Sequence, residues 1–252
     1  ARVDRRLSGG VGDTLEVTVE WAPGRRFVIS APDRPDVLPE AMALAADTAT
    51  AVLRRFPDHG GMLEYVYFDR AFYGFKEGHY AGMTEATAPS IHLNVDFAAA
   101  GAALDMMRRR DREPEQETEP QRRAGTPAAA VAAPFTAVDG TVAHEIWHKV
   151  ESVFEARHYA ASIEFRRALG RSLGVETLEH VVKGGEPGAP ASWRRAHERL
   201  SEEASPYATT TIHEATAELF KLWWCRDDAP APLVRRFGDV LDEFLPPPGP
   251  AR

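Results

Sequence analysis

The sequence predicts an α+β fold, because strand patterns dominate its first part and helical patterns its last part. Residues 15–21 and 27–30 alternate apolar and polar side chains around Pro23-Gly24, which is typical of a β-hairpin. Beyond residue 137, apolar residues recur at helical spacing. A stretch rich in proline, glutamate and alanine separates the two parts. We therefore expect a β-containing lobe over 1–107, a flexible insertion over 108–136 and a helical lobe over 137–252, within one domain overall.

The N-terminal lobe is expected to hold one long helix and several strands. An Ala-rich pattern over 38–56 predicts the helix, which Pro57 ends. The aromatic runs 65–68 and 72–75 predict strands of a sheet face; the alternative is an aromatic wall that contacts substrate. Residues 91–97 alternate without a break and form the clearest strand pattern in the chain.

The C-terminal lobe is expected to consist of helices. The first follows an N-cap at Asp139 or Thr141 and carries an apolar stripe that includes Ile146 and Val150. Further helices are expected over 160–173, 192–204, 207–224 and 232–245.

Composition narrows the classes of function. The 252-residue chain has 44% hydrophobic residues, enough for a substantial core, and a formal net charge of −8. This acidity argues against nucleic acid as the main partner, and no apolar run approaches the ~20 residues that cross a bilayer, so we expect no membrane insertion. The single cysteine, Cys225, is expected to be a buried thiol without a disulfide. With no secretion signal in the Arg-rich start, the location stays unknown: cytoplasmic, or secreted without disulfides.

An H-E-x-x-H motif, His144-Glu145-Ile146-Trp147-His148, lies in the first helix of the C-terminal lobe. Two histidines four residues apart lie about 6 Å apart on one helix face, so their ring nitrogens can converge on one metal ion. Glu145 is within reach of a water molecule on that ion. The motif therefore predicts a zinc-dependent hydrolase.

Two histidines do not complete a catalytic zinc site, which usually has three protein ligands and one open position. Glu151 shares the helix face of the histidines, but it is seven residues from His144, about 10 Å along the axis. We expect it to support a ligand or to face solvent, and His158 is too distant altogether. The third ligand must come from another part of the chain.

The segment 207–224 carries Tyr207 and, seven residues later, a Glu-Ala-Thr-Ala-Glu run that begins at Glu214. Together with the H-E-x-x-H motif, this arrangement resembles the gluzincin peptidases related to the anthrax lethal factor catalytic domain, a group that includes Pro-Pro endopeptidases. The resemblance covers roughly residues 65–224 and is specific at the two motifs. It implies a zincin-like fold, in which the metal site lies between a small mixed β-sheet lobe and a helical lobe.

The resemblance also assigns roles to single residues. It makes His144, His148 and Glu214 the zinc ligands and Glu145 the general base. Tyr207 would correspond to the tyrosine that steadies the oxyanion, although an aromatic packing role is the alternative. Glu218 is the rival third ligand; otherwise it accepts a hydrogen bond from a ligand histidine. The neighbouring His213 points away from Glu214 and is expected to be a surface or packing residue.

Zincins commonly bind an extended peptide against an edge strand upstream of the metal helix. The resemblance gives this role to the strand over 91–97, with His92, Leu93 and Asn94 as substrate-binding residues. The alternative is a half-buried strand in which His92 faces solvent or forms hydrogen bonds.

The leading hypothesis is a zinc-dependent endopeptidase, in which Glu145 deprotonates metal-activated water. The second is a catalytically silent zincin-fold protein that uses a zinc-stabilised site for binding or scaffolding. The third is a helical interaction protein whose histidines are incidental. The presence of Glu145, which a structural zinc site does not need, favours the first.

Overall fold

A computed structural model describes residues 2–3, 14–32, 39–59, 63–69, 82–84, 88–94, 138–225 and 230–248. The chain divides into two compact units, one of residues 1–51 and 63–142 and the other of residues 52–62 and 143–252. Residues 52–62 therefore belong with the helical unit and not, as expected, with the N-terminal lobe. The expected insertion over 108–136 and the aromatic run 72–75 lie outside the described residues.

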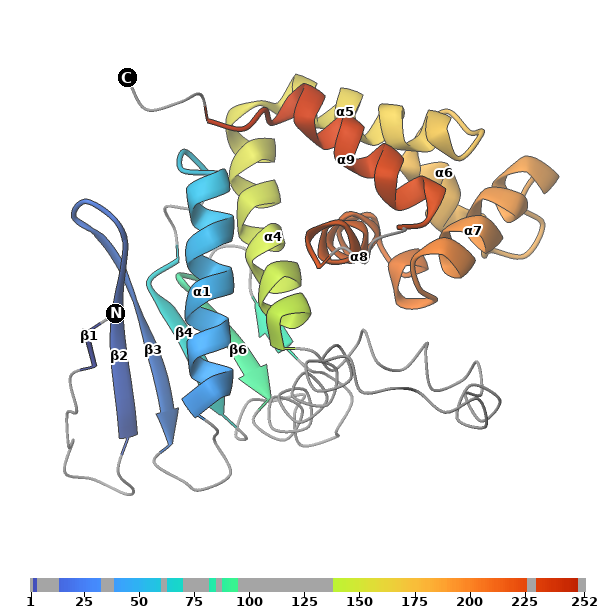
Figure 1. Cartoon of the computed structure of the whole chain (residues 1–252). Coiled ribbons are helices and arrows are strands. Elements are labelled where there is room, and N and C mark those ends of the chain that lie inside the picture. Colours follow the sequence, from blue (N-terminus) through green and yellow to red (C-terminus); the bar gives the residue numbers. More distant parts are fainter. Residues whose placement is uncertain are drawn as a thin grey trace, which may run out of the picture. The chain divides into compact units, whose positions relative to one another are not determined.

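The described strands of the first unit form a mixed sheet in the order β1-β2-β3-β4-β6-β5 (Figure 1). Strands β3, β4 and β6 are parallel to one another, whereas the other neighbours pair antiparallel. Together with the helices described below, this sheet confirms the α+β class. The strands are β1 (Arg2–Val3), β2 (Thr14–Ala22), β3 (Arg25–Pro32), β4 (Tyr65–Asp69), β5 (Gly82–Thr84) and β6 (Ser90–Asn94).

The predicted hairpin and the predicted long helix are both confirmed. Gly24, in the turn between β2 and β3, has a φ of 70°, a left-handed conformation that glycine adopts without strain. Side chains on alternate positions of both strands are buried, as the alternating pattern requires. Helix α1 (Pro39–Arg55) matches the predicted range 38–56 closely and buries a row of small residues that includes Ala41, Ala45 and Ala49.

The strand predicted over 91–97 is β6, but it is not an edge strand. It pairs with β4 on one side and with β5 on the other, where Met83 lies opposite His92. The alternation of apolar and polar residues predicts which side chains of this strand are buried, but it does not predict how many strands pair with it. With only three residues, β5 shows no recognisable alternation. Residues 95–97 lie outside the described part of the chain.

The second unit is helical. Helices α5, α7 and α9 match three predicted ranges to within a residue or so, and α6 was not predicted because six residues carry too little periodicity. Helix α4 begins at Val138, so Asp139 and Thr141 lie inside its first turn. The prediction that one of these two residues is the N-cap is therefore wrong. The helices are α4 (Val138–Arg157), α5 (Tyr159–Ser172), α6 (Leu178–Lys183), α7 (Ala191–Glu203), η4 (Tyr207–Thr209), α8 (Ile212–Trp224) and α9 (Pro232–Phe244).

The helix predicted over 207–224 is interrupted. A short 3₁₀ turn, η4, precedes α8, and Thr211 is the N-cap of α8, where its side chain accepts a hydrogen bond from the Glu214 N–H at 3.1 Å. Threonines favour such caps over helix interiors, because their hydroxyl groups compete for backbone partners. The break places Tyr207 and Glu214 on separate elements.

An aromatic cluster joins α4 to α8 and α9. The Trp147 indole is fully buried and stacks on Phe220 with ring centroids 4.7 Å apart, and it also meets Phe237 edge-on at 6.0 Å. Such contacts combine a large buried area with a specific geometry. Because Trp147 lies inside the H-E-x-x-H motif, this cluster fixes the spacing between the motif and α8. Cys225, expected to be buried, is only half-buried at the end of α8.

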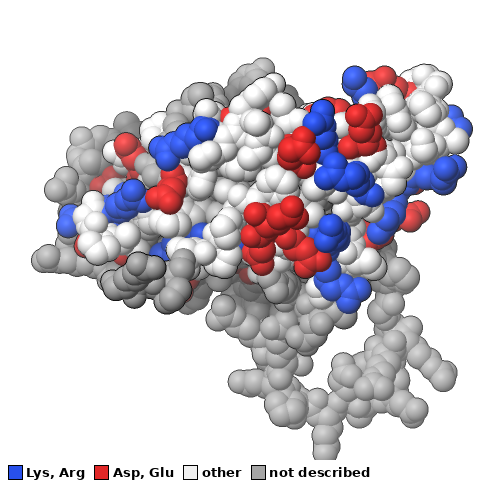
Figure 2. Space-filling view, turned by 90° about the horizontal axis from the view of Figure 1, so that it is seen from above, with Lys and Arg blue, Asp and Glu red and all other residues white. Residues whose placement is uncertain are grey.

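No helix among the described residues has the length and apolar character needed to cross a membrane. On the face drawn in Figure 2, the acidic and basic side chains of the described residues are interspersed.

Candidate metal centre

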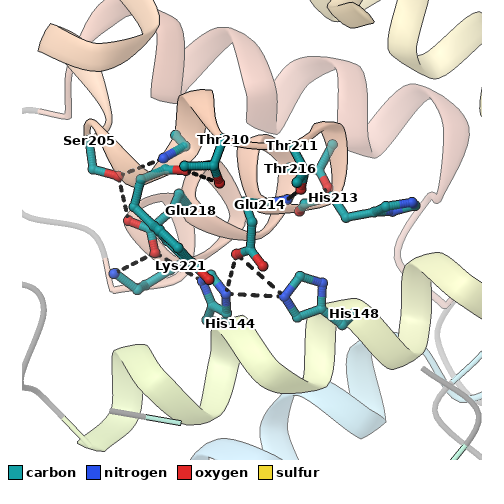
Figure 3. Close-up of polar contacts among 12 residues, drawn as sticks. His144, His148, Ser205, Thr210, Thr211, His213, Glu214, Thr216, Glu218 and Lys221 are labelled. Atoms are coloured by element: carbon teal, nitrogen blue, oxygen red, sulfur yellow. Dashed lines mark hydrogen bonds and ion pairs between the residues drawn. The ribbon is translucent and has the colours of Figure 1, made fainter. Parts of the chain in front are cut away.

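The two motif histidines project from one face of α4 toward α8 (Figure 3). Their Nε2 atoms are 3.1 Å apart, and their side chains are largely buried. The four-residue spacing within a helix produces this convergence. Ile146 and Val150 are fully buried, so the opposite face of α4 packs as the apolar stripe predicted.

Glu214 completes a cluster of three groups. Its Oε2 atom lies 3.0 Å from Nε2 of His144 and 3.7 Å from Nε2 of His148. The ligand atoms of His144, His148 and Glu214 all lie within 4.8 Å of one another. All three residues belong to the second unit, so the centre that was expected between two lobes is built from one of them.

The cluster brings three potential ligand atoms together: Nε2 of His144, Nε2 of His148 and Oε2 of Glu214. Glu218 Oε1 lies 2.9 Å from Nδ1 of His144, so in the neutral ring the proton resides on Nδ1 and Nε2 carries a lone pair. Glu214 Oε2 is buried and has no hydrogen-bond partner, although it lies close to both rings. Lone pairs in such proximity repel one another unless a cation lies between them.

The donor set and its dimensions fit zinc. Zinc binds histidine nitrogen at about 2.0–2.1 Å and carboxylate oxygen at about 2.0–2.2 Å, so neighbouring ligand atoms of a tetrahedral site lie about 3.3–3.5 Å apart. The separations of 3.0, 3.1 and 3.7 Å bracket this value. Two histidines and one glutamate are also a donor combination found in catalytic zinc sites.

In the metal-free protein a proton supplies the missing positive charge. Burial lowers the pKa of His144, but the adjacent carboxylates of Glu214 and Glu218 outweigh burial and raise this pKa to about 9. Burial raises the pKa of Glu214, but the two histidines outweigh burial and hold this pKa well below its ordinary value. The site therefore favours a positive charge, which a proton or a metal ion can supply.

Glu218 is fully engaged on the far side of His144. Besides the imidazole, it accepts hydrogen bonds from Lys221 Nζ at 2.7 Å and from Ser205 Oγ at 2.9 Å. Both oxygens are thus occupied in a buried environment, and the carboxylate keeps its charge because burial is outweighed by His144 and Lys221, which lower its pKa. These contacts favour the supporting role for Glu218 over the rival role of third ligand.

Ser205 and Lys221 were not singled out in the sequence. The three-residue spacing between Glu218 and Lys221 on one helix face was a signal that could have found the lysine. Ser205 lies 13 residues before Glu218 and outside α8, so no local pattern connects the two.

Glu145 is buried beside the cluster, with 5% of its surface exposed. Burial raises the pKa of its carboxyl group, whereas His144 and His148 act to lower it. A carboxylate in such a place accepts a proton more readily than one in water.

Tyr207 lies next to the cluster. Its ring is stacked on that of His144, with centroids 6.2 Å apart and an angle of 27° between the planes. Its exposed fraction of 37% is high for an aromatic packing residue, so part of the side chain remains accessible to solvent.

Glu151 and His213 pair with each other outside the cluster. Glu151 is buried, so of its two expected roles the solvent-facing one is wrong, and its carboxylate lies 2.9 Å from His213 Nδ1. About half of the His213 side chain is exposed, as expected for a surface residue. His158, beyond the end of α4, is also exposed and is not part of the cluster.

The expected substrate-binding residues lie in the first unit. His92 Nδ1 is 2.9 Å from Asp69 Oδ2, and the ring stacks on Tyr67 at 5.1 Å, so the histidine forms hydrogen bonds within its own sheet. Leu93 and Asn94 are 2% and 3% exposed and belong to the interior. These contacts match the alternative of a half-buried strand.

Comparisons with known proteins add nothing to this geometry, since no family model, no curated protein and no solved structure matches the chain.

Proposed function

We propose that the protein is a zinc-dependent endopeptidase of gluzincin type, with His144, His148 and Glu214 as zinc ligands. The observation that supports the proposal is the convergence of three largely buried potential ligand atoms at separations of 3.0–3.7 Å, with Glu218 beside the far nitrogen of His144. A helical interaction protein has no need for such an arrangement, because unsatisfied buried acceptors destabilise the fold.

The roles of the remaining residues follow from their positions. When bound, zinc supplies Lewis acidity, which makes water more acidic and polarises a carbonyl group. Glu145 accepts the proton of the attacking water and passes it to the leaving amine. Tyr207, partly exposed beside His144, donates a hydrogen bond to the oxygen on which negative charge develops. Glu218 keeps the His144 ring oriented.

The proposed substrate is a peptide or protein segment bound in extended form. We propose no strand of the protein as the partner of this segment, because β6 has neighbours on both sides and Leu93 and Asn94 are buried.

The test combines metal content with cleavage. The purified chain is expected to bind about one zinc ion and to cleave members of a diverse peptide library. Glu145→Gln is expected to retain the zinc and to lose cleavage. Glu164→Gln serves as a matched control, because Glu164 is a largely exposed glutamate on α5 and its loss should leave both properties unchanged.

Two results would overturn the proposal. A chain that binds no zinc at stoichiometric level supports an interaction protein with incidental histidines. A chain that binds zinc but cleaves no library peptide, with wild type and Glu145→Gln alike, supports the catalytically silent alternative.

A further inference from the structure

A pocket lies at the other end of α4 from the metal centre, within the second unit. Its walls come from the end of α1, the junction of α4 with α5 and the residues that follow α9. The cavity measures about 320 Å³, within the range of small-molecule sites. His158, one of its lining residues, is ten residues beyond His148, about 15 Å along the helix. The pocket is therefore separate from the metal centre.

Most of the wall is apolar. Phe56, Phe154 and Phe244 contribute aromatic rings, and Leu245 and Pro246 add aliphatic surface. Such a lining packs against a flat or aliphatic body and offers few partners to a strongly polar one.

Two nitrogens in the wall residues have no partner. Arg55 Nη1 and His59 Nε2 are buried and form no hydrogen bond. Unsatisfied buried polar atoms are rare in native proteins, and those that occur often mark a place for an absent ligand or water.

The guanidinium of Arg55 is nevertheless held in place. Its Nη2 atom donates to Asp242 Oδ1 at 2.6 Å and to the Leu245 carbonyl at 2.8 Å, and the group lies 4.7 Å from the centre of the Phe56 ring. The guanidinium thus keeps one nitrogen without an acceptor in the chain, and a small rotation can present that nitrogen to an acceptor from outside.

The surrounding charges limit the anion to a single charge. Arg55 and the nearby Arg157, which donates to the Asp58 carbonyl at 2.8 Å, are positive. The carboxylates of Asp58 and Asp242 lie beside the same wall and oppose a second negative charge on the ligand. A carboxylate therefore fits better than a phosphate.

We propose that this pocket binds a small monocarboxylate with an aromatic or aliphatic body. Its carboxylate accepts hydrogen bonds from Arg55 Nη1 and His59 Nε2, and its body packs against the phenylalanine rings. Since both nitrogens lie beneath the wall, small rotations of the two side chains accompany binding.

The experiment is a titration of the 252-residue chain with phenylacetate in the presence of zinc, followed by calorimetry and by NMR. Phenylacetamide is the matched neutral probe, and we expect it to bind at least tenfold more weakly. Arg55→Leu is expected to weaken phenylacetate binding at least tenfold, whereas Arg54→Leu, which removes an exposed arginine from the same helix, changes it less than twofold.

Two further variants keep the test decisive. Ala161→Phe adds a ring to the pocket from α5, which supplies none of the contacts of Arg55 given above, and it is expected to abolish binding. His148→Ala removes a proposed zinc ligand and should leave binding unchanged, which excludes a carboxylate on the metal. Equal binding of acid and amide, binding that survives Ala161→Phe, or binding that disappears with His148→Ala would each overturn the proposal.

Discussion

Glu218 Oε1 lies 2.9 Å from Nδ1 of His144, while Glu214 Oε2 lies 3.0 Å from Nε2 of the same ring. One imidazole thus stands between two carboxylates: Glu218 accepts a hydrogen bond from Nδ1–H, and Glu214 lies beside Nε2. The two glutamates, one helical turn apart, consequently have different roles.

Removing the two carboxylates is expected to weaken zinc binding unequally. Glu218→Ala should cost about 10–100-fold in affinity, as is typical of residues that orient a ligand, and Glu214→Ala should cost more because a ligand is lost. Competition with a chromophoric chelator measures both values. Full zinc affinity in Glu214→Ala would remove that residue from the ligand set.

Zinc binding is expected to release a proton. Burial opposes protonation of His144, but Glu214 and Glu218 outweigh burial and raise its pKa to about 9, so the metal-free ring is charged at pH 7. An arriving ion must displace this proton, and affinity should therefore increase as the pH rises toward 9. Calorimetry in buffers of different ionisation enthalpy should show about one proton released per ion from this ring. A binding constant independent of pH between 7 and 8 would contradict the expectation.

Lys221 is expected to be important for stability as well as for the site. Its ammonium pairs with Glu218 at 2.7 Å, and both side chains are buried, so Lys221→Met leaves a buried carboxylate short of a partner. Such losses destabilise by about 3–5 kcal/mol, and the remaining contacts of Glu218 place the expected value near the lower end. Urea denaturation of the wild type and of Lys221→Met measures this difference in the free energy of unfolding.

The control is Arg167→Met, which breaks an ion pair of the same three-residue spacing with Glu164. Both of those side chains are more than 40% exposed, so the loss should stay below about 1 kcal/mol. Similar losses for the two variants would show that burial of the Lys221 pair has no energetic consequence.

Two glycines are expected to respond differently to alanine. A Cβ at Gly170, in α5, meets the backbone of Thr177, which cannot move aside, so Gly170→Ala should destabilise by about 1–3 kcal/mol or more. At Gly185 the nearest atom is Cε1 of the His197 ring at 2.7 Å, and a side chain can rotate away. Thermal unfolding should therefore show a clearly larger drop in Tm for Gly170→Ala, and equal drops would contradict this account.

The contact between His213 and Glu151 is expected to make stability depend on pH. The hydrogen bond to Glu151 raises the pKa of His213 against the opposing effect of burial. Because the folded-state pKa is above the unfolded value, this contribution is complete below about pH 6.5 and is lost as the pH rises through the folded-state pKa. The urea midpoint of the wild type should thus exceed that of His213→Gln by more at pH 6 than at pH 9. A constant difference would contradict the assignment.

The sequence predicted most of what depends on local periodicity. The hairpin, α1 and the long helices of the second unit have regular patterns over eight or more residues, and the H-E-x-x-H spacing alone brings His144 and His148 together. Glu214 required the resemblance to a family, because nothing local connects α4 with α8.

The features that the sequence did not predict depend on contacts between distant segments. The position of β6 inside the sheet is decided by β5. The break before α8 is an exception, because the cap at Thr211 is a local contact that the apolar pattern over 207–224 did not reveal. Ser205 reaches Glu218 only after the chain has folded. A single sequence contains no direct signal for such pairings.

The stack of Trp147 on Phe220 has a consequence for the choice of ion. This core contact joins the motif helix to the helix of Glu214, so the donor spacing is set by hydrophobic packing before any ion arrives. Calcium requires six to eight oxygen atoms at about 2.3–2.6 Å, and magnesium prefers oxygen ligands in an octahedron. Two imidazoles and one carboxylate at fixed close range suit neither of these ions, so under the proposed function the choice of metal would depend on the aromatic core.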